Sequence, residues 1–288
     1  MSGNPDIRQA LAFAAEELSN AGVPEPQRDA RGLVCLAAGV DTAFTFAHPE
    51  RVLTDMETER LQVLVARRAA HEPFQYISGR QEFYGREFLV TPAVMIPRPE
   101  TELIVEEGVR LLTGLPSPRI CEVGVGSGCI TVSFLCEMPE AEAVALDISP
   151  AAIDVASENA SRLGVSDRVT FRESDVFSAL SPGEEFDLVV SNPPYVPARD
   201  VETLQAEVRD YEPKVALTEG GSGLSIIERI VNEAGSRLKD GGYLLMEIGF
   251  NQSAAVTDLF TAVPEAEAMF FPDLQGIPRM VKARYSTT

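Results

Sequence analysis

Residues 119–128 have the sequence RICEVGVGSG, an apolar run that ends in a glycine-rich turn. The run up to Val123 predicts a buried strand, and the apolar segment from Cys129 to Met138 has the length of a helix. Glycines at such a bend let a ligand approach the backbone, and the next helix presents free N–H groups at its positive end. A nicotinamide site, a flavin site or tight packing would use a similar turn, so the motif alone leaves these alternatives open.

The spacing of this turn and the strand that follows it narrow the alternatives. The glycines are spaced G-x-G-x-G, which departs from the dinucleotide pattern G-x-G-x-x-G, because Cys129 and Ile130 stand where a further glycine is expected. The run Val144–Asp147 predicts a second strand that ends in an acid about 20 residues further on. A carboxylate at that position suits the hydroxyls of a ribose.

The tetrapeptide Asn192-Pro193-Pro194-Tyr195 follows the apolar run 186–191, at the edge where open α/β sheets bind their ligands. The two prolines lack a backbone N–H, so they end the strand and leave their carbonyls free. Asn192 can donate and accept hydrogen bonds, and Tyr195 supplies a flat face, so the group fits a planar –NH2 nitrogen. A plain turn at a strand end would also explain the tetrapeptide alone. With the glycine turn and Asp147 in this order, the chain resembles an S-adenosylmethionine-dependent N-methyltransferase.

Strands and helices alternate from Pro118 onward, which predicts a parallel sheet covered on both faces with an antiparallel pair at its edge. We expect strands near 119–123, 142–147, 168–173, 186–191, 242–249, 266–271 and 279–285, and helices near 127–137, 150–162, 222–238 and 252–261. Residues 5–70 show helical spacing, and 75–90 show the aromatic and β-branched pattern of a β-hairpin. The expected domains are a helical domain over 1–74, a hairpin linker over 75–95 and a catalytic domain over 96–288. The long connection 192–222 favours a functional lid.

Composition excludes several classes of function. The 288 residues carry 24 basic and 44 acidic side chains, a net charge of −20, which disfavours binding to DNA through phosphate neutralisation. The sequence contains no run of about 18 apolar residues and no secretory signal, so we expect no membrane association. Four cysteines without a C-x-x-C pair and only two histidines favour buried thiols in a reducing cytoplasm and a mechanism without a metal.

Several further motifs make the chain similar to the release factor glutamine methyltransferases over nearly its whole length. They are Tyr76-Ile77-Ser78-Gly79, Pro97-Arg98-Pro99-Glu100-Thr101-Glu102, Glu212-Pro213, Ala216-Leu217 and Gly220-Gly221-Ser222-Gly223-Leu224. The chain departs from the family where Glu122 and Val125 replace a frequent Asp and Thr. It departs again at Val176, where an aromatic residue often lies beside the adenine.

The resemblance implies a Rossmann-like, seven-stranded α/β methyltransferase domain joined by a β-hairpin linker to a small helical domain that docks the substrate. It implies that the chain transfers a methyl group from S-adenosylmethionine to the N5 nitrogen of the GGQ glutamine in class I release factors, leaving S-adenosylhomocysteine. The cofactor-binding residues would be Glu122, Gly124, Val125, Gly126, Ser127, Gly128, Asp147, Asp175, Val176, Phe177 and Asn192. Asp175 would accept from the adenine amino group, with Val176 and Phe177 against the ring. Asn192, Pro193, Pro194 and Tyr195 would bind the glutamine, and Asn192, Pro193 and Tyr195 would be catalytic.

Three alternatives stay open at this point. The glutamine could belong to a ribosomal protein, the substrate could be an adenine N6 of RNA or DNA, or the chain could bind the cofactor without catalysis. The acidic net charge disfavours an adenine of RNA or DNA as the substrate. The intact Asn192–Tyr195 tetrapeptide disfavours a protein that binds the cofactor without catalysis. Arg98, Glu100 and Glu102 fit helix capping and a local ion pair as well as a site wall, and Glu247 is interpreted as structural.

Overall fold

The computed structural model describes residues 4–273 and 275–286. Packing divides the chain into two compact units. One contains the described residues up to Gly79 together with Gln205–Tyr211, and the other contains Arg80–Leu204 and the described residues from Glu212 onward. The chain therefore leaves the second unit after Leu204, contributes seven residues to the first, and returns at Glu212.

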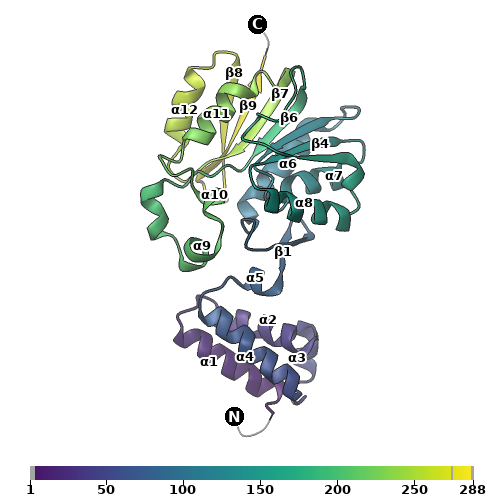
Figure 1. Ribbon diagram of the computed structural model, residues 1–288, viewed down its shortest axis with the longest axis vertical. Helices are drawn as coiled ribbons and strands as arrows, with labels where there is room; N and C mark the ends of the chain where they lie inside the picture. The colour runs from purple at the N-terminus through teal and green to yellow at the C-terminus, as the bar shows by residue number, and fades with distance from the viewer. Residues whose placement is uncertain (1–3, 274, 287–288) are drawn as a thin grey trace. The chain divides into compact units, whose positions relative to one another are not determined.

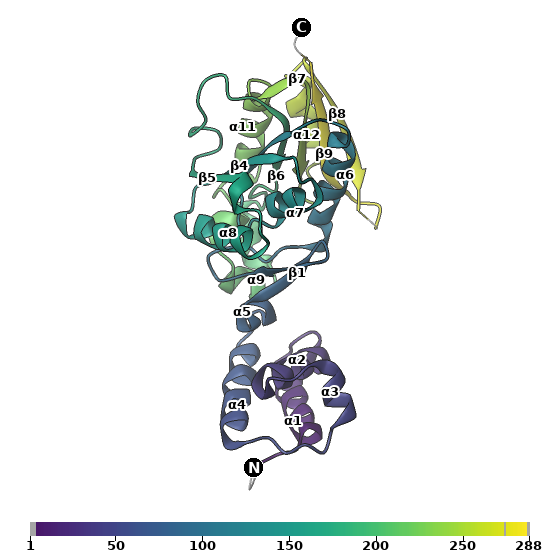
Figure 2. The same cartoon turned by 90° about the vertical axis from the view of Figure 1, so that its right-hand side faces the viewer.

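The first unit is helical, with α1 (Ile7–Asn20), α2 (Pro26–Ala38), α3 (Thr42–Ala47), α4 (Asp55–Ala69), α5 (Phe74–Ser78) and, from the later segment, α9 (Ala206–Tyr211). Two of these helices begin at capping boxes, Asp6 with Gln9 and Thr54 with Glu57, which satisfy free N–H groups of the first turn. The apolar faces of α1, α2 and α4 meet in one core that includes Leu18, Leu33 and Leu61 (Figures 1 and 2).

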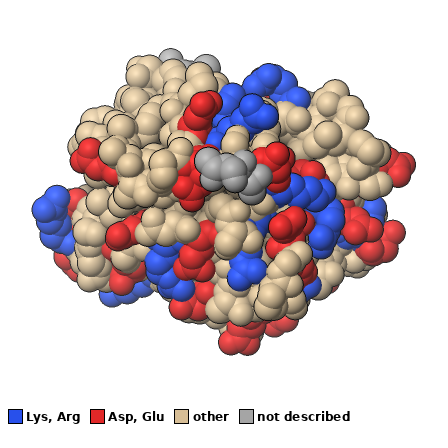
Figure 3. Space-filling model, turned by 90° about the horizontal axis from the view of Figure 1, so that it is seen from above, with Lys and Arg blue, Asp and Glu red and all other residues tan. Residues whose placement is uncertain are grey.

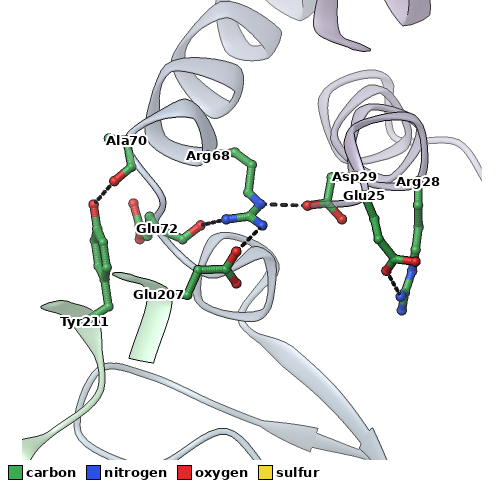
Figure 4. Close-up of polar contacts among 8 residues, drawn as sticks. All are labelled: Glu25, Arg28, Asp29, Arg68, Ala70, Glu72, Glu207 and Tyr211. Carbon is green, nitrogen blue, oxygen red and sulfur yellow. Dashed lines mark hydrogen bonds and ion pairs between the residues drawn. The ribbon is translucent and has the colours of Figure 1, made fainter. Parts of the chain in front are cut away.

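Residues 205–211 are held to this unit by specific bonds to α4 and to the turn after it. The buried Arg68 donates to Asp29 of α2 (2.7 Å), to the Glu72 carbonyl (3.1 Å) and to Glu207 of α9 (2.6 Å). Figure 4 shows this guanidinium between its three acceptors, with the Tyr211 hydroxyl bonded to the Ala70 carbonyl. The connection predicted as a lid thus contains short helices, η3 (Ala198–Thr203), α9 and α10 (Lys214–Leu217), one of which packs in the helical unit.

The second unit is built on a seven-stranded sheet of strand order β5-β4-β3-β6-β7-β9-β8. Its strands are β3 (Arg119–Val123), β4 (Glu142–Asp147), β5 (Val169–Glu173), β6 (Phe186–Ser191), β7 (Leu238–Glu247), β8 (Ala266–Pro272) and β9 (Pro278–Tyr285). The first five are parallel, and β9 pairs antiparallel with both β7 and β8. The strand order reverses between β3 and β6, and ligands of open α/β sheets bind at such a switch point, beyond the carboxyl ends of the strands.

Helices cover both faces of this sheet, as Figures 1 and 2 show. The helices α6 (Glu102–Leu112), α7 (Cys129–Glu137) and α8 (Pro150–Arg162) lie on one face, and α11 (Ser225–Ala234) and α12 (Ser253–Thr261) on the other. Successive strand residues point to opposite faces, so Val189 packs in the α11–α12 core while Leu188 and Val190 pack in the α6–α7 core. The predicted Rossmann-like α/β fold is confirmed.

One local prediction is wrong. The hairpin expected over 75–90 begins only at Arg80, with β1 (Arg80–Phe83) and β2 (Arg86–Leu89), because Phe74–Ser78 form α5. The aromatic and β-branched residues that suggested a strand pack in the helical core, where the Phe74 ring fills the space a Cβ on Gly32 would need. Tertiary packing has overridden local strand propensity.

Charged side chains of both signs are interspersed on the face drawn in Figure 3. Ion pairs between charged side chains of the second unit include Arg172 with Glu184, Lys239 with Asp187 and Lys282 with Glu107. This face therefore lacks the segregated basic surface that phosphate binding requires.

Candidate active site

The glycine turn lies at the carboxyl end of β3, where the backbone bends sharply into α7. Gly124, Gly126 and Gly128 all have positive φ, at 79°, 53° and 80°, a conformation that residues with a Cβ adopt at a cost of about 1–2 kcal/mol. A Cβ on Gly128 would lie 3.1 Å from the Cβ of Ala156 in α8, so this glycine also lets two helices approach closely. The turn is therefore fixed by backbone geometry.

Asp147, at the end of the neighbouring strand β4, is bonded to this turn. Its Oδ2 accepts from the Gly126 N–H and its Oδ1 from the Ser149 N–H, both at 2.9 Å. Burial raises the pKa of Asp147, and the backbone N–H groups oppose that rise by stabilising the charged form. Each oxygen keeps a further lone pair, and the residue lines the cavity described below. A pair of hydroxyls would find two acceptors there.

Glu122 lies beneath the turn and is 1% exposed. Its carboxylate accepts from the backbone N–H of Thr131 (3.0 Å) and from the Thr131 hydroxyl, which ties β3 to the first turns of α7. Burial raises the pKa of Glu122 to about 8. Glu122 is therefore a buried acid that braces the glycine turn through α7.

The segment after β5 forms another wall. Val176 has φ 51°, which is rare for a β-branched residue, and its carbonyl accepts from the Ser174 hydroxyl at 2.7 Å. Asp175 is exposed and accepts from Arg229 at 2.8 Å. Backbone strain of this kind gathers at ligand sites, because the surrounding structure must hold it in place.

The Asn192–Tyr195 tetrapeptide follows β6, beside the turn that follows β3. The Asn192 Nδ2 donates to the Thr101 hydroxyl (3.1 Å), which donates to Glu247 (2.6 Å), and the Tyr195 hydroxyl donates to the same carboxylate (3.0 Å). Burial raises the pKa of both Glu247 and Tyr195. The Tyr195 carbonyl accepts from Gln252 at 2.9 Å. Side chains from η1, from the end of β7 and from the residue before α12 thus hold the tetrapeptide.

These elements enclose one cavity of about 320 Å³ at the switch point of the sheet. The residues of the glycine turn, the strand-end acids and the tetrapeptide that line it are Glu122, Gly124, Val125, Gly126, Ser127, Asp147, Asp175, Val176, Asn192, Pro193 and Pro194. The cavity is therefore shaped by sequence motifs that lie up to about seventy residues apart and meet only in the fold.

Comparison with known proteins agrees with this geometry. The family model described as the PrmC N-terminal domain matches residues 9–79, and the methyltransferase small domain matches residues 104–223. A release factor glutamine methyltransferase of Koribacter versatilis is 42% identical over 282 residues, which cover 98% of this chain and 99% of that protein. One of Geobacter sulfurreducens is 40% identical and covers 96% of each chain. The chain belongs to the release factor glutamine methyltransferase family.

Membership of this family makes the chain a methyltransferase, as its motifs predicted. The crystal structure of the hMettl16 catalytic domain with a MAT2A hairpin is 15% identical, covers 82% of this chain and 84% of that one, and has a TM-score of 0.57. At that identity the likeness concerns the fold alone. Within residues 4–273 and 275–286, no helix has the length and apolarity needed to cross a bilayer. The same residues contain no group of three or more His, Cys, Asp and Glu that could hold a metal ion.

Three of the predicted site residues make their contacts next to the cavity or in the core. Among the described residues, Gly128, Phe177 and Tyr195 are absent from the cavity lining. Phe177 is fully buried in the α11–α12 core, so it does not replace the aromatic ring that Val176 lacks. Gly128 caps α7, and the Tyr195 hydroxyl is engaged by Glu247.

Sequence reasoning also missed some lining residues, and it expected the partner of Arg98 to lie nearby in the chain. Ile148 lines the cavity although its side chain is 54% exposed, and its place directly after a strand-end acid was a usable signal. Further lining residues that the motifs did not indicate are Ala93, Val94, Met95, Val215 and Ile226. Arg98 forms its ion pair with the buried Glu212, far along the chain, and Glu102 accepts from the Tyr84 N–H at 2.8 Å.

Proposed function

We propose that the protein transfers a methyl group from S-adenosylmethionine to the side-chain amide nitrogen (N5) of the GGQ glutamine in class I release factors, and leaves S-adenosylhomocysteine. The observation that carries the proposal is that Asn192 and Pro193 line the same cavity as the glycine turn and Asp147. Relatives of this family that match 96–98% of the chain are named for that substrate. We expect the enzyme to work in the cytoplasm, where release factors meet the ribosome.

The cavity fits the cofactor in three respects. The backbone of Gly124 and Gly126 is open to a ligand, with nothing or only the Asn192 carbonyl (3.9 Å) near the position of an added Cβ. Asp147 has lone pairs for the ribose hydroxyls, and Asp175 with Val176 offers an acid and an apolar wall for the adenine. When bound, S-adenosylmethionine supplies a methyl carbon on a sulfonium leaving group, so no metal is needed.

The chain's own task is to position a weak nucleophile. The lone pair of a glutamine amide nitrogen is delocalised into the carbonyl, so its reactivity depends on orientation and on the charge around it. We infer that the Asn192 Oδ1 and the Pro193 carbonyl accept the two hydrogens of the substrate –NH2 group. That arrangement fixes the amide plane and favours the positive charge that develops on the nitrogen, and the proton leaves to water after transfer. Tyr195 and Pro194 hold the two acceptors in place.

We further propose that the helical unit docks the release factor. It has its own core, and α4 carries two exposed apolar side chains one heptad apart, Met56 (79% exposed) and Val63 (60% exposed). The acidic net charge favours a protein substrate over RNA or DNA, whose phosphates it would repel.

The deciding experiment incubates the purified protein with methyl-labelled S-adenosylmethionine and a class I release factor, beside a copy whose GGQ glutamine is changed to alanine. Label on the first protein alone supports both the reaction and the target residue. Label on neither, with the cofactor bound, refutes the proposal and directs the search to ribosomal proteins and then to RNA. Asn192→Ala should lower kcat by about 10²–10³ while cofactor affinity changes little, because one preorganised hydrogen-bond partner is lost. A variant with more than half the activity would exclude this role for Asn192.

A further inference from the structure

The side chains of Asn192, Thr101, Glu247 and Tyr195 form a continuous hydrogen-bonded chain beside the cavity. They come from the end of η1 (Pro99–Thr101), from the loop after β6 and from the end of β7. Thr101 is 2% exposed and Glu247 4% exposed, so water does not compete for these bonds. Neither residue is assigned a role in the proposed reaction above, although Thr101 lines the cavity.

The direction of each bond in this chain follows from the donors and acceptors available. The Tyr195 and Thr101 hydroxyls both donate to Glu247, one to each oxygen, and these two bonds favour the charged carboxylate, which has no proton to give. A threonine hydroxyl has a single proton, and Thr101 uses it on Glu247 at 2.6 Å. The Thr101 oxygen can then only accept from Asn192, which must turn its –NH2 group toward Thr101.

From this polarity we infer that Thr101 and Glu247 are positioning residues, which fix the Asn192 amide so that its Oδ1 faces the substrate nitrogen. The oxygen and nitrogen of a planar amide lie on opposite branches of the same carbon, so anchoring Nδ2 directs Oδ1 away from Thr101. The inference rests on the proposed function, in which Oδ1 accepts an N–H of the substrate glutamine. A reversed amide would set an –NH2 group against another –NH2 group, and that contact has no acceptor.

The hydrogen bond from Asn192 to Thr101 fixes the orientation of the Asn192 amide. An Asn amide on a surface exchanges its two orientations freely, because its oxygen and nitrogen are nearly equal in size. In the reversed orientation the Asn192 oxygen would face the Thr101 oxygen, with no proton between the two acceptors. Such a buried, unpaired contact carries the full desolvation penalty of both groups. By that difference the Asn192 side chain is held in one orientation before substrate arrives, which is the preorganisation that electrostatic catalysis requires.

The test compares Thr101→Val with Thr101→Ser in the full-length enzyme on a class I release factor. Valine keeps the shape of threonine and removes the acceptor, so kcat should fall about 10- to 100-fold, less than for Asn192→Ala. KM for the release factor and the Kd for S-adenosylmethionine, measured by calorimetry, should stay within about threefold, because neither ligand contacts the lost hydroxyl in this scheme. Thr101→Ser keeps the hydroxyl and should return kcat to within about threefold of the wild-type value.

A double-variant cycle separates positioning from general support of the fold. If Thr101 acts only through Asn192, Thr101→Val should slow the Asn192→Ala enzyme no further, whereas independent effects would multiply. Where Thr101→Val fails to fold in a thermal melt, Glu247→Gln replaces it. Glutamine offers one acceptor oxygen to two donating hydroxyls, so kcat should fall about fivefold or more.

The outcomes distinguish a failure of the proposed function from a failure of the positioning role of Thr101. A wild-type enzyme that does not label the release factor refutes the proposed function. A wild-type enzyme that labels it, with Thr101→Val within twofold of its kcat or with multiplicative effects in the double variant, overturns the positioning role alone.

Discussion

Gly223 is the position where a single methyl group should disturb the catalytic loop most directly. Its φ is +80°, and a Cβ added there would lie 2.2 Å from the carbonyl oxygen and 2.9 Å from the carbonyl carbon of Tyr195. Gln252 fastens the same two segments, since its Nε2 donates to the Tyr195 carbonyl (2.9 Å) and to the Gly223 carbonyl (3.0 Å). The atoms nearest to the added Cβ belong to the backbone of Tyr195, so Gly223→Ala requires the backbone to move.

The size of the effect can be worked from these contacts. Ordinary contact between the two atoms needs a separation greater by ~1 Å, and a misplacement of that size in a catalytic group costs about 10²-fold in rate. The left-handed conformation adds a penalty of about 1–2 kcal/mol in the free energy of unfolding. Gly220→Ala is the matched control, because Gly220 has φ +86° and open space where a Cβ would stand. It carries the conformational penalty without the overlap.

The assay measures initial rates at saturating cofactor and release factor, beside urea denaturation of both variants. Gly220→Ala should lose about 1–2 kcal/mol of stability and keep kcat close to the wild-type value. Gly223→Ala should lose more stability and about 10²-fold in kcat, with a smaller change in cofactor affinity. The reasoning fails if Gly223→Ala matches Gly220→Ala in both stability and kcat, since the Tyr195 segment would then have absorbed the methyl group without consequence.

Two further predictions concern buried charge. Arg68→Met should lower the free energy of unfolding of the helical unit by about 3–5 kcal/mol, because the buried carboxylate of Asp29 and the half-buried one of Glu207 lose their counter-ion. Arg28→Met is its control, since the exposed Arg28–Glu25 pair should contribute less than about 1 kcal/mol, and equal losses in urea denaturation would contradict the assignment. Glu122, whose pKa is raised to about 8, binds a proton more tightly in the folded state than in the unfolded state. Its contribution to stability is present in full below about pH 4 and is lost as pH rises through about 8, so Glu122→Gln should flatten the fall in stability between about pH 5 and pH 9. Identical profiles of stability against pH for the wild type and Glu122→Gln would contradict the raised pKa of the Glu122 carboxyl.

The parts of the fold that sequence predicted are those carried by local signals. Apolar runs such as 186–191 form strands at nearly the expected bounds, because residues on both faces of a covered parallel sheet must be apolar. The glycine turn and the acid at Asp147 were found by spacing alone, and they meet as expected through the Gly126–Asp147 bond. Strand pairing then brings the turns after β3 and β6 together without further information.

What sequence could not predict depends on partners remote in the chain. Glu247 looks like any acid at a strand end until the fold brings Thr101, which is 146 residues away, to its carboxylate. Phe177 was expected beside the adenine, but a residue four positions after a strand can turn inward as easily as outward, and here it completes the core. Residues 205–211 carry no local sign that they pack with helices encoded more than 130 residues earlier.

This last feature changes how docking by the helical unit should be tested. Deleting residues 1–75 would remove Arg68 and Ala70, to which Glu207 and Tyr211 are bonded. A truncated enzyme would therefore lose support for the segment that continues the Asn192 loop, and its inactivity would say nothing about docking. Substitution of exposed side chains avoids that difficulty.

Met56→Glu combined with Val63→Glu places two charges on the exposed face of α4 and leaves the core of the unit intact. If the release factor docks there, KM for the intact factor should rise about tenfold or more, since two apolar contacts are replaced by charges that must be desolvated. The rate on a short GGQ peptide, which lacks the rest of the release factor, should not change, and neither should the melting temperature by more than a few degrees. An unchanged KM for the intact factor would place the docking surface on another part of the molecule, because a charged pair at the centre of an interface cannot be neutral to binding.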